Sequence, residues 1–191
     1  MDESKFIIGI DEVGRGSWAG PLVVSAVLLN DEVEGLNDSK VLSFKRRSQL
    51  DSLIRQKTNL IAIAEVSSQI IDEIGLTKAI TLAMSKAVQD LKTINYNKII
   101  IDGNYNFLPN FERVETLIKA DSKIPAVMAA SITAKVYRDN LMIKMAAKYP
   151  DYGFESNFGY GTKQHIEALS KHGPTSIHRL SYKPVKAVLI H

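Results

Sequence analysis

The chain has 191 residues, of which 45% are hydrophobic and 24% are charged. This is the composition of one globular domain, and it excludes a disordered, collagen-like or low-complexity chain. The sequence contains no cysteine, which excludes disulfide bonds, thiolate metal sites and cysteine nucleophiles, so a metal ion would need oxygen or histidine ligands. The apolar runs are too short to span a membrane, and residues 1–5 lack the features of a signal peptide. We therefore expect a cytoplasmic protein that does not bind membranes.

Periodicity predicts a series of strands and helices. Short apolar runs at residues 6–10, 22–29, 60–66 and 98–101 are typical of buried strands. Apolar residues recur every three or four positions over residues 76–92, which predicts an amphipathic helix. Pro125 fits the first turn of a long helix that runs to about residue 149. The pattern predicts an α/β fold, a mixed sheet flanked by helices, in about residues 1–150. A mostly helical C-terminal segment follows, at about residues 151–191 of the same single domain.

Acidic residues follow two of the predicted strands. Asp11 and Glu12 come directly after residues 6–10, and Asp102 comes directly after residues 98–101. If these strands are adjacent and parallel, the acids meet at one edge of the sheet, and Asp121 can reach the same edge. Four carboxylates repel one another unless cations lie between them, and oxygen-only clusters suit Mg²⁺ or Mn²⁺. The pattern indicates a two-metal site for phosphodiester chemistry.

Three of these acids also have a purely structural interpretation, whereas Glu12 beside Asp11 is harder to explain in that way. Asp11 can close a strand. Asp102 opens a common turn signature, and Asp121 can cap or precede a helix.

Gly14-Arg15-Gly16 forms a glycine-flanked turn in which the main chain can come close to a ligand, and Arg15 is available to bind a phosphate. The spacing of its glycines does not match a dinucleotide-binding fingerprint.

The net charge of +3 hides an uneven distribution. From Leu141 onward there are seven basic residues against three acidic ones, and all four histidines and several tyrosines lie among them. This composition is typical either of a surface that binds nucleic acid or of a solvated face whose tyrosines anchor a core.

The sequence resembles ribonuclease HII in a series of motifs that covers nearly the whole chain. In chain order the motifs are residues 8–16 (IGIDEVGRG) with Ala19-Gly20-Pro21, 36–40 (LNDSK), 101–104 (IDGN), 119–123 (KADSK), 129–139 (AASITAKVYRD), 159–162 (GYGT) with His165, and Gly173-Pro174-Thr175 with His178-Arg179.

This resemblance implies a ribonuclease H-like fold and a metal-dependent endoribonuclease. Such an enzyme cleaves the 5′ side of ribonucleotides embedded in duplex DNA, and RNA in RNA–DNA hybrids, by two-metal-ion hydrolysis that leaves 3′-hydroxyl and 5′-phosphate ends. It also implies a role for each matching residue. The four catalytic acids would hold two Mg²⁺ or Mn²⁺ ions, and they are Asp11, Glu12, Asp102 and Asp121. The main chain of Gly14, Arg15 and Gly16 would read the ribose 2′-hydroxyl, and Tyr160 would pack on the sugar.

Other matched residues keep two interpretations each. Lys40 would hold a phosphate near the scissile bond or belong to a surface turn. Lys135 and Arg138 would contact the substrate backbone or pair with acids, and Asp139 is expected to form an ion pair or to orient a neighbour rather than bind metal. For His165 and His178 we expect structural or phosphate-contact roles, because metal ions would activate the water.

The chain departs from related sequences at one point, and two alternative functions stay open. Ser17-Trp18 stands where related sequences commonly carry Pro-Leu, so the turn is expected to be less rigid. Trp18 lies close to this turn in the sequence, and its purely structural interpretation is that it fills a gap between sheet and helix. The first alternative is ribonuclease HIII or another ribonuclease H-like nuclease. It fits less well, because ribonuclease HIII normally carries an extra domain before its catalytic motif and only ten residues precede Asp11 here. A non-catalytic nucleic-acid-binding module would gain nothing from clustered acids. We expect a monomer. Residues 182–191 show no clear clamp-binding peptide, so a clamp partner stays undecided.

Overall fold

The computed structural model describes residues 6–29, 31, 33–36, 42–58, 60–91 and 95–189. Within these ranges the chain forms one sheet of five strands in the order β3-β2-β1-β4-β5. Their bounds are β1 Ile7–Val13, β2 Leu22–Leu28, β3 Ile61–Val66, β4 Lys98–Asp102 and β5 Val114–Leu117. The β1–β2 and β2–β3 pairs are antiparallel, whereas β1–β4 and β4–β5 are parallel. The predicted mixed sheet is therefore confirmed, and so is the parallel pairing of the strands before Asp11 and Asp102.

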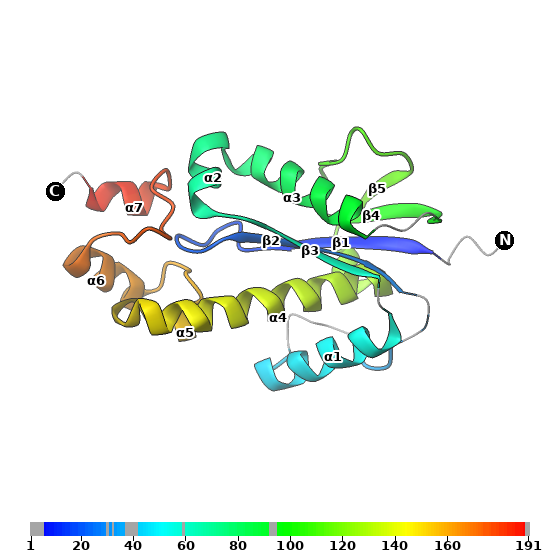
Figure 1. Ribbon diagram of the computed structural model, residues 1–191, viewed down its shortest axis with the longest axis horizontal. Coiled ribbons are helices and arrows are strands. Elements are labelled where there is room, and N and C mark those ends of the chain that lie inside the picture. The colour runs from blue at the N-terminus through cyan, green and yellow to red at the C-terminus, as the bar shows by residue number, and fades with distance from the viewer. Residues whose placement is uncertain are drawn as a thin grey trace.

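Helices cover both faces of this sheet (Figure 1). Helices α2 (Ser68–Ile74) and α3 (Leu76–Asp90) lie on one face, and α1 (Phe44–Lys57) and α4 (Pro125–Lys148) lie on the other. The predicted helices at residues 76–92 and 125–149 are confirmed as α3 and α4. Apolar side chains of β1 and β2 pack with those of α3 on the first face, and Val27 joins residues of α1 and α4 on the second.

Helix α4 packs directly on the backbone of β1 at Gly9. A Cβ atom added there would lie 2.2 Å from the carbonyl carbon of Ala126 and from the amide nitrogen of Val127. Only glycine allows such an approach. The contact sets the depth of α4 on the sheet, and with it the positions of the later residues of α4 that lie near the end of β1.

The C-terminal segment gathers at the end of the molecule opposite the N-terminus (Figure 1). Its elements are η2 Pro150–Tyr152, α5 Phe154–Asn157, α6 Lys163–His172 and α7 Lys183–Val188. One further short element, η1 Ala120–Ser122, lies outside this segment, directly before α4. A separate apolar cluster joins this segment to Ala19 and to Met142 of α4. The expected mostly helical C-terminal segment is confirmed.

The strand boundary predicted at residue 10 is wrong. Strand β1 continues through Asp11 and Glu12 to Val13, because it stays paired with β2 as far as the Val13–Val23 pair. The two acids therefore have the fixed backbone of a strand rather than the freedom of a loop.

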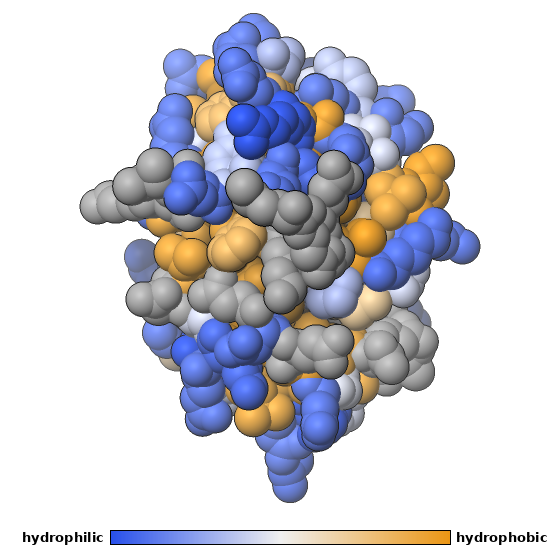
Figure 2. Space-filling view, turned by 90° about the vertical axis from the view of Figure 1, so that its right-hand side faces the viewer, coloured by the Kyte–Doolittle hydropathy of each residue, from blue (hydrophilic) through white to orange (hydrophobic). Residues whose placement is uncertain are grey.

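The surface at the N-terminal end is largely hydrophilic, with apolar residues in small groups (Figure 2). Large apolar side chains that are exposed are scattered over many elements, as is ordinary for a globular protein. No helix in the described ranges is both long enough and apolar enough to cross a lipid bilayer.

Candidate active site

The parallel pairing of β1 with β4 brings the predicted acids together. Ile10 is the register partner of Ile101, so Asp11 and Asp102 follow side by side. The Asp102 Oδ1 atom accepts hydrogen bonds from the main-chain N–H groups of Ala120, at 2.7 Å, and of Asp121, at 3.4 Å. These bonds hold η1 against the end of β4, and they place the buried Asp121 beside Asp102.

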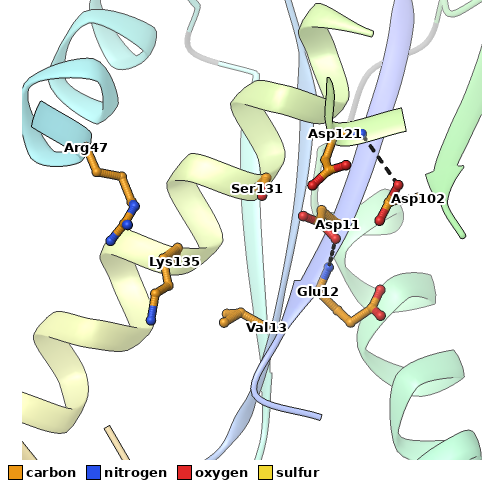
Figure 3. A pocket seen from close by; sticks show the side chains of 8 residues that line it. All are labelled: Asp11, Glu12, Val13, Arg47, Asp102, Asp121, Ser131 and Lys135. Carbon is orange, nitrogen blue, oxygen red and sulfur yellow. Dashed lines mark hydrogen bonds between the residues drawn. The ribbon is translucent and has the colours of Figure 1, made fainter. Parts of the chain in front are cut away.

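The four acids share one cavity of about 380 Å³ (Figure 3). Its lining comes from β1, α1, β4, η1 and α4, through residues Asp11, Glu12, Val13, Arg47, Asp102, Asp121, Ser131 and Lys135. Asp11, Asp102 and Asp121 approach one another from three separate segments, and Arg47 and Lys135 stand across the cavity from them (Figure 3). The structure thus gathers residues separated by more than a hundred positions in the sequence.

Burial strongly affects the acids of β1. It raises the pKa of Asp11 to about 8, against a hydrogen bond from Ser131 that lowers it and with a further rise from the charges of Glu12 and Asp102. Burial also raises the pKa of Glu12, although Arg15 opposes this with its Nη1 atom 3.1 Å from Glu12 Oε1. The other carboxylate oxygen of Glu12 is buried and has no hydrogen-bond partner.

These observations fit divalent cations. A buried carboxylate oxygen without a partner and an acid whose pKa is raised by burial and by its acidic neighbours both fit a site for positive charge. Carboxylate oxygens are the donors that Mg²⁺ and Mn²⁺ prefer. In the described part of the chain, no three Asp, Glu or His side chains stand where they could hold a metal ion as they are. Because Glu12 points toward Arg15 and Asp11 accepts the main-chain N–H of Glu12, ion binding entails side-chain movement.

Two basic side chains, Arg47 and Lys135, face these acids across the cavity. Lys135 Nζ lies 2.7 Å from Asp139 Oδ1, and Arg47 Nη1 lies 3.6 Å from Asp139 Oδ2. Asp139 is 1% exposed, so the expected ion-pair role of Asp139 is confirmed. Sequence reasoning missed Arg47 because it did not predict α1, although the run Lys45-Arg46-Arg47 was a visible sign of positive charge.

Two buried arginines donate hydrogen bonds to the turn after β1, residues 14–21. Arg138 donates to the carbonyl oxygens of Pro21, Phe158 and Ala19 and to the Ser17 hydroxyl. The prediction that Arg138 contacts substrate or pairs with an acid is therefore wrong, because main-chain carbonyls and the Ser17 hydroxyl take up its donors and the side chain is fully buried. Gly14 is required here, since its φ is +94° and a Cβ atom would lie 2.4 Å from Arg138 Nε.

The second arginine, Arg179, holds the same turn from the C-terminal segment. It donates to the Gly20 carbonyl and, at 3.1 Å, to the Arg15 carbonyl, which also accepts the Tyr182 hydroxyl at 2.6 Å. The Arg15 side chain is exposed, and a Cβ atom at Gly16 would meet open space. Residues 14–16 therefore form a fixed turn whose outer side is open, and Val13, directly before it, lines the acidic cavity.

The comparisons with known proteins agree along nearly the whole chain. The sequence matches the family model described as Ribonuclease HII over residues 8–185. The chain belongs to the ribonuclease HII family. Ribonuclease HII of Francisella philomiragia is 42% identical over 186 residues, which cover 96% of this chain and 99% of that protein. Ribonuclease HII of Bacillus subtilis is 45% identical over 186 residues, which cover 96% of this chain and 71% of that protein.

A solved structure supports the same fold. The structure of the PCNA:RNase HII complex from Archaeoglobus fulgidus matches with a TM-score of 0.81 and 30% identity, over 95% of this chain and 96% of that chain. Membership of the ribonuclease HII family makes the chain a metal-dependent ribonuclease of the ribonuclease H type. The family match favours ribonuclease HII over the ribonuclease HIII and non-catalytic alternatives.

The remaining predicted residues of this ribonuclease HII lie apart from the acidic cavity or outside the described ranges. Tyr160 is half-buried, with its ring centroid 5.5 Å from the Arg138 guanidinium carbon, and it is not among the described residues that line the cavity. Lys40 lies outside the described residues. Trp18 packs against Gly161 and the His165 ring rather than between sheet and helix, because the turn after β1 contacts the C-terminal segment.

Proposed function

We propose that this ribonuclease HII cleaves the phosphodiester on the 5′ side of ribonucleotides embedded in duplex DNA, and RNA in RNA–DNA hybrids, leaving 3′-hydroxyl and 5′-phosphate ends. The observation that carries the proposal is the convergence of Asp11, Glu12, Asp102 and Asp121 on one cavity at the end of β1. These four side chains would hold two Mg²⁺ or Mn²⁺ ions. When bound, such ions supply activation of water and neutralisation of the charge on the phosphate.

The chain's own residues orient this cluster. Asp102 holds η1 through two main-chain N–H groups, and this contact fixes the backbone of Asp121. The hydrogen bond from Ser131 orients the Asp11 carboxylate. Arg47 and Lys135 place positive charge on the opposite side of the cavity, where it attracts the phosphate backbone of a nucleic acid.

Recognition of the ribose is assigned to the turn beside the acids. Main-chain groups of Gly14, Arg15 and Gly16 would read the 2′-hydroxyl, and Tyr160 would pack on the sugar. Because Arg138 and Arg179 fix this turn, its groups cannot rearrange around a deoxyribose. Polar groups that are left unpaired in this way cost more than the loss of a contact, and this cost gives selectivity for ribonucleotides.

Cleavage by the purified chain tests the proposal. We expect a DNA duplex with one ribonucleotide to be cut once, on the 5′ side, only when Mg²⁺ or Mn²⁺ is present, with ends identified by mapping on a denaturing gel. The chain is taken as one catalytic domain that acts as a monomer, so no other protein is added. Cleavage on the 3′ side, or cleavage in the presence of a chelator, would contradict the proposal.

Asp11→Asn and Asp102→Asn test the assignment of the acids. Both variants should abolish cleavage, because an amide is a poor ligand for these ions. Their fold, measured by circular dichroism and thermal unfolding, should be retained, since the substitution relieves repulsion between the acids. Near-native turnover of either variant with Mg²⁺ would show that the assignment is wrong.

A further inference from the structure

Two buried histidines, which the proposed hydrolysis does not use, face each other in the C-terminal segment. His165 lies on α6 and is 0% exposed, and His178 lies in the segment before α7 and is 2% exposed. Their Nε2 atoms are 3.0 Å apart. Side chains buried in this way cannot contact a phosphate of the substrate, so the phosphate-contact role that the sequence left open is excluded. Any effect of this pair on the reaction must act through the residues that the pair contacts.

The positions of the protons in this pair follow from one main-chain contact. The Thr175 N–H group donates to His178 Nδ1 at 2.8 Å, and a main-chain N–H can only donate, so His178 Nδ1 carries no proton. The neutral His178 ring therefore carries its proton on Nε2 and donates it to His165 Nε2. His165 must then carry its proton on Nδ1, which donates to the Tyr160 carbonyl oxygen at 3.0 Å.

The surroundings keep both rings neutral. Burial lowers the pKa of His165, and burial together with His165 lowers the pKa of His178 to about 4. The rings of Trp18, Tyr152 and Phe154 pack around the pair. A further proton on His165 would lie on Nε2 and oppose the Nε2–H group of His178 across the 3.0 Å contact. A further proton on His178 would lie on Nδ1 and oppose the Thr175 N–H group. The hydrogen-bond chain from Thr175 to Tyr160 therefore has one direction.

This chain connects Tyr160 to the turn after β1. The main chain of His178 pairs with Ala19 in an antiparallel bridge, and the N–H of Arg179 donates to the Trp18 carbonyl at 2.7 Å. The Tyr160 carbonyl also accepts the N–H of Thr162. That bond is local and moves with Tyr160. The preceding Gly159 carbonyl accepts the N–H groups of Trp18, at 2.7 Å, and of Ala19, at 3.2 Å, which ties the backbone before Tyr160 to the turn after β1. The bond from His165 ties the carbonyl group of Tyr160 itself to a segment that is fixed to the same turn.

We propose that His165 and His178 are positioning residues that hold Tyr160 at the sugar of the ribonucleotide through this directed chain of hydrogen bonds. The inference rests on the proposed role of Tyr160. It assigns to the pair a part in substrate selectivity, without any contact with the substrate or with the metal ions.

Nitrogen-15 NMR of the imidazole rings tests the hydrogen-bond chain without any reference to cleavage. At pH 7 we expect the Nδ1–H tautomer for His165 and the Nε2–H tautomer for His178. The exposed His172, which lies outside the pair, serves as the internal control. The reverse tautomers, or a charged pair at pH 7, would overturn the proposal.

Two substitutions of His165 separate positioning from packing. Asn places an amide N–H near the position of Nδ1 and can still donate to the Tyr160 carbonyl, whereas Gln reaches the position of Nε2 and loses that bond. Loss of one buried hydrogen bond corresponds to a roughly tenfold effect. We therefore expect His165→Gln to lower kcat/KM for a single embedded ribonucleotide about tenfold, while His165→Asn stays within about threefold of the unmodified protein.

The affinity for an all-DNA duplex should be the same in both His165 variants, and His172→Gln should cleave as the unmodified protein does. Equal losses in the Asn and Gln variants, or full cleavage by His165→Gln, would overturn the positioning role.

Tyr160→Ala distinguishes failure of the positioning role from failure of the proposed function. If Tyr160→Ala cleaves normally, then the role given to Tyr160 is wrong. If only Tyr160→Ala is impaired, the recognition role stands and the histidine pair has no part in it.

Discussion

At the scale of single residues, the two largest fully buried side chains are Arg138 and Arg179, and neither forms a salt bridge among the described residues. Burial lowers the pKa of Arg138 to about 10, so it stays charged at neutral pH. Burial of a charge without an acidic partner is costly unless hydrogen bonds satisfy it. Main-chain carbonyls of the turn after β1 supply those bonds, and the consequence is a turn with one conformation.

Ser17 completes this arrangement in place of a proline. Its hydroxyl donates to the Gly14 carbonyl at 2.9 Å and accepts from Arg138 Nη2 at 2.7 Å. The loss of rigidity expected from the absence of proline is thus opposed by two buried hydrogen bonds. Sequence reasoning did not find this role, because a serine in a turn gives no sign of the distant arginine that it contacts.

Ser17→Ala should therefore destabilise the protein. The substitution removes both hydrogen bonds and leaves a charged donor of Arg138 poorly satisfied, which costs about 1–3 kcal/mol. Urea unfolding followed by circular dichroism measures the loss. Ser52→Ala, which removes an exposed helical hydroxyl, is the matched control and should change stability by less than about 0.5 kcal/mol. Equal effects of the two substitutions would show that the contact with Arg138 contributes nothing.

At the scale of elements, the long periodic or strongly apolar segments could be predicted and the marginal ones could not. Helices α3 and α4 and strands β1 to β4 bury continuous apolar faces, which leave a clear pattern in the sequence. Helix α1 was missed because it buries only Leu50, Asp51 and Ile54, and the short edge strand β5 was missed because it has no fully buried residue. Such elements depend on tertiary contacts more than on their own pattern.

Gly9→Ala tests the contact between α4 and β1. The added methyl group would overlap backbone atoms of Ala126 and Val127, which a flexible side chain cannot relieve. We expect a loss of about 3 kcal/mol or more, measured by urea unfolding. Gly16→Ala is the control for stability, because its methyl group would meet open space. A Gly9→Ala protein as stable as the control would mean that α4 does not pack on β1 as closely as the structure shows.

At the scale of the whole molecule, the acidic cavity could be predicted more completely than the framework that supports it. Acids after strand-like runs, together with the resemblance to ribonuclease HII, predicted that Asp11 and Asp102 would meet. Nothing local predicted that the C-terminal segment would fix the turn after β1, because the bonds of Arg179 to Gly20 and Arg15 span more than 150 residues. Contacts of that kind depend on the final fold.

The distribution of charge over the whole molecule leads to a prediction for nucleic-acid binding. Arg47 and Lys135 line the acidic cavity, and further lysines lie along α4 and the C-terminal segment, so affinity should fall as salt releases these contacts. With about three phosphate contacts, the affinity of the Asp11→Asn protein for a duplex with one ribonucleotide should fall roughly 40-fold between about 50 and 200 mM salt. Lys135→Gln should reduce the slope of log affinity against log salt by about one. Lys86→Gln, on the exposed side of α3 across the sheet, should leave the slope unchanged. Fluorescence anisotropy measures these slopes, and an affinity that does not respond to salt would contradict phosphate contacts on the side of the sheet covered by α4.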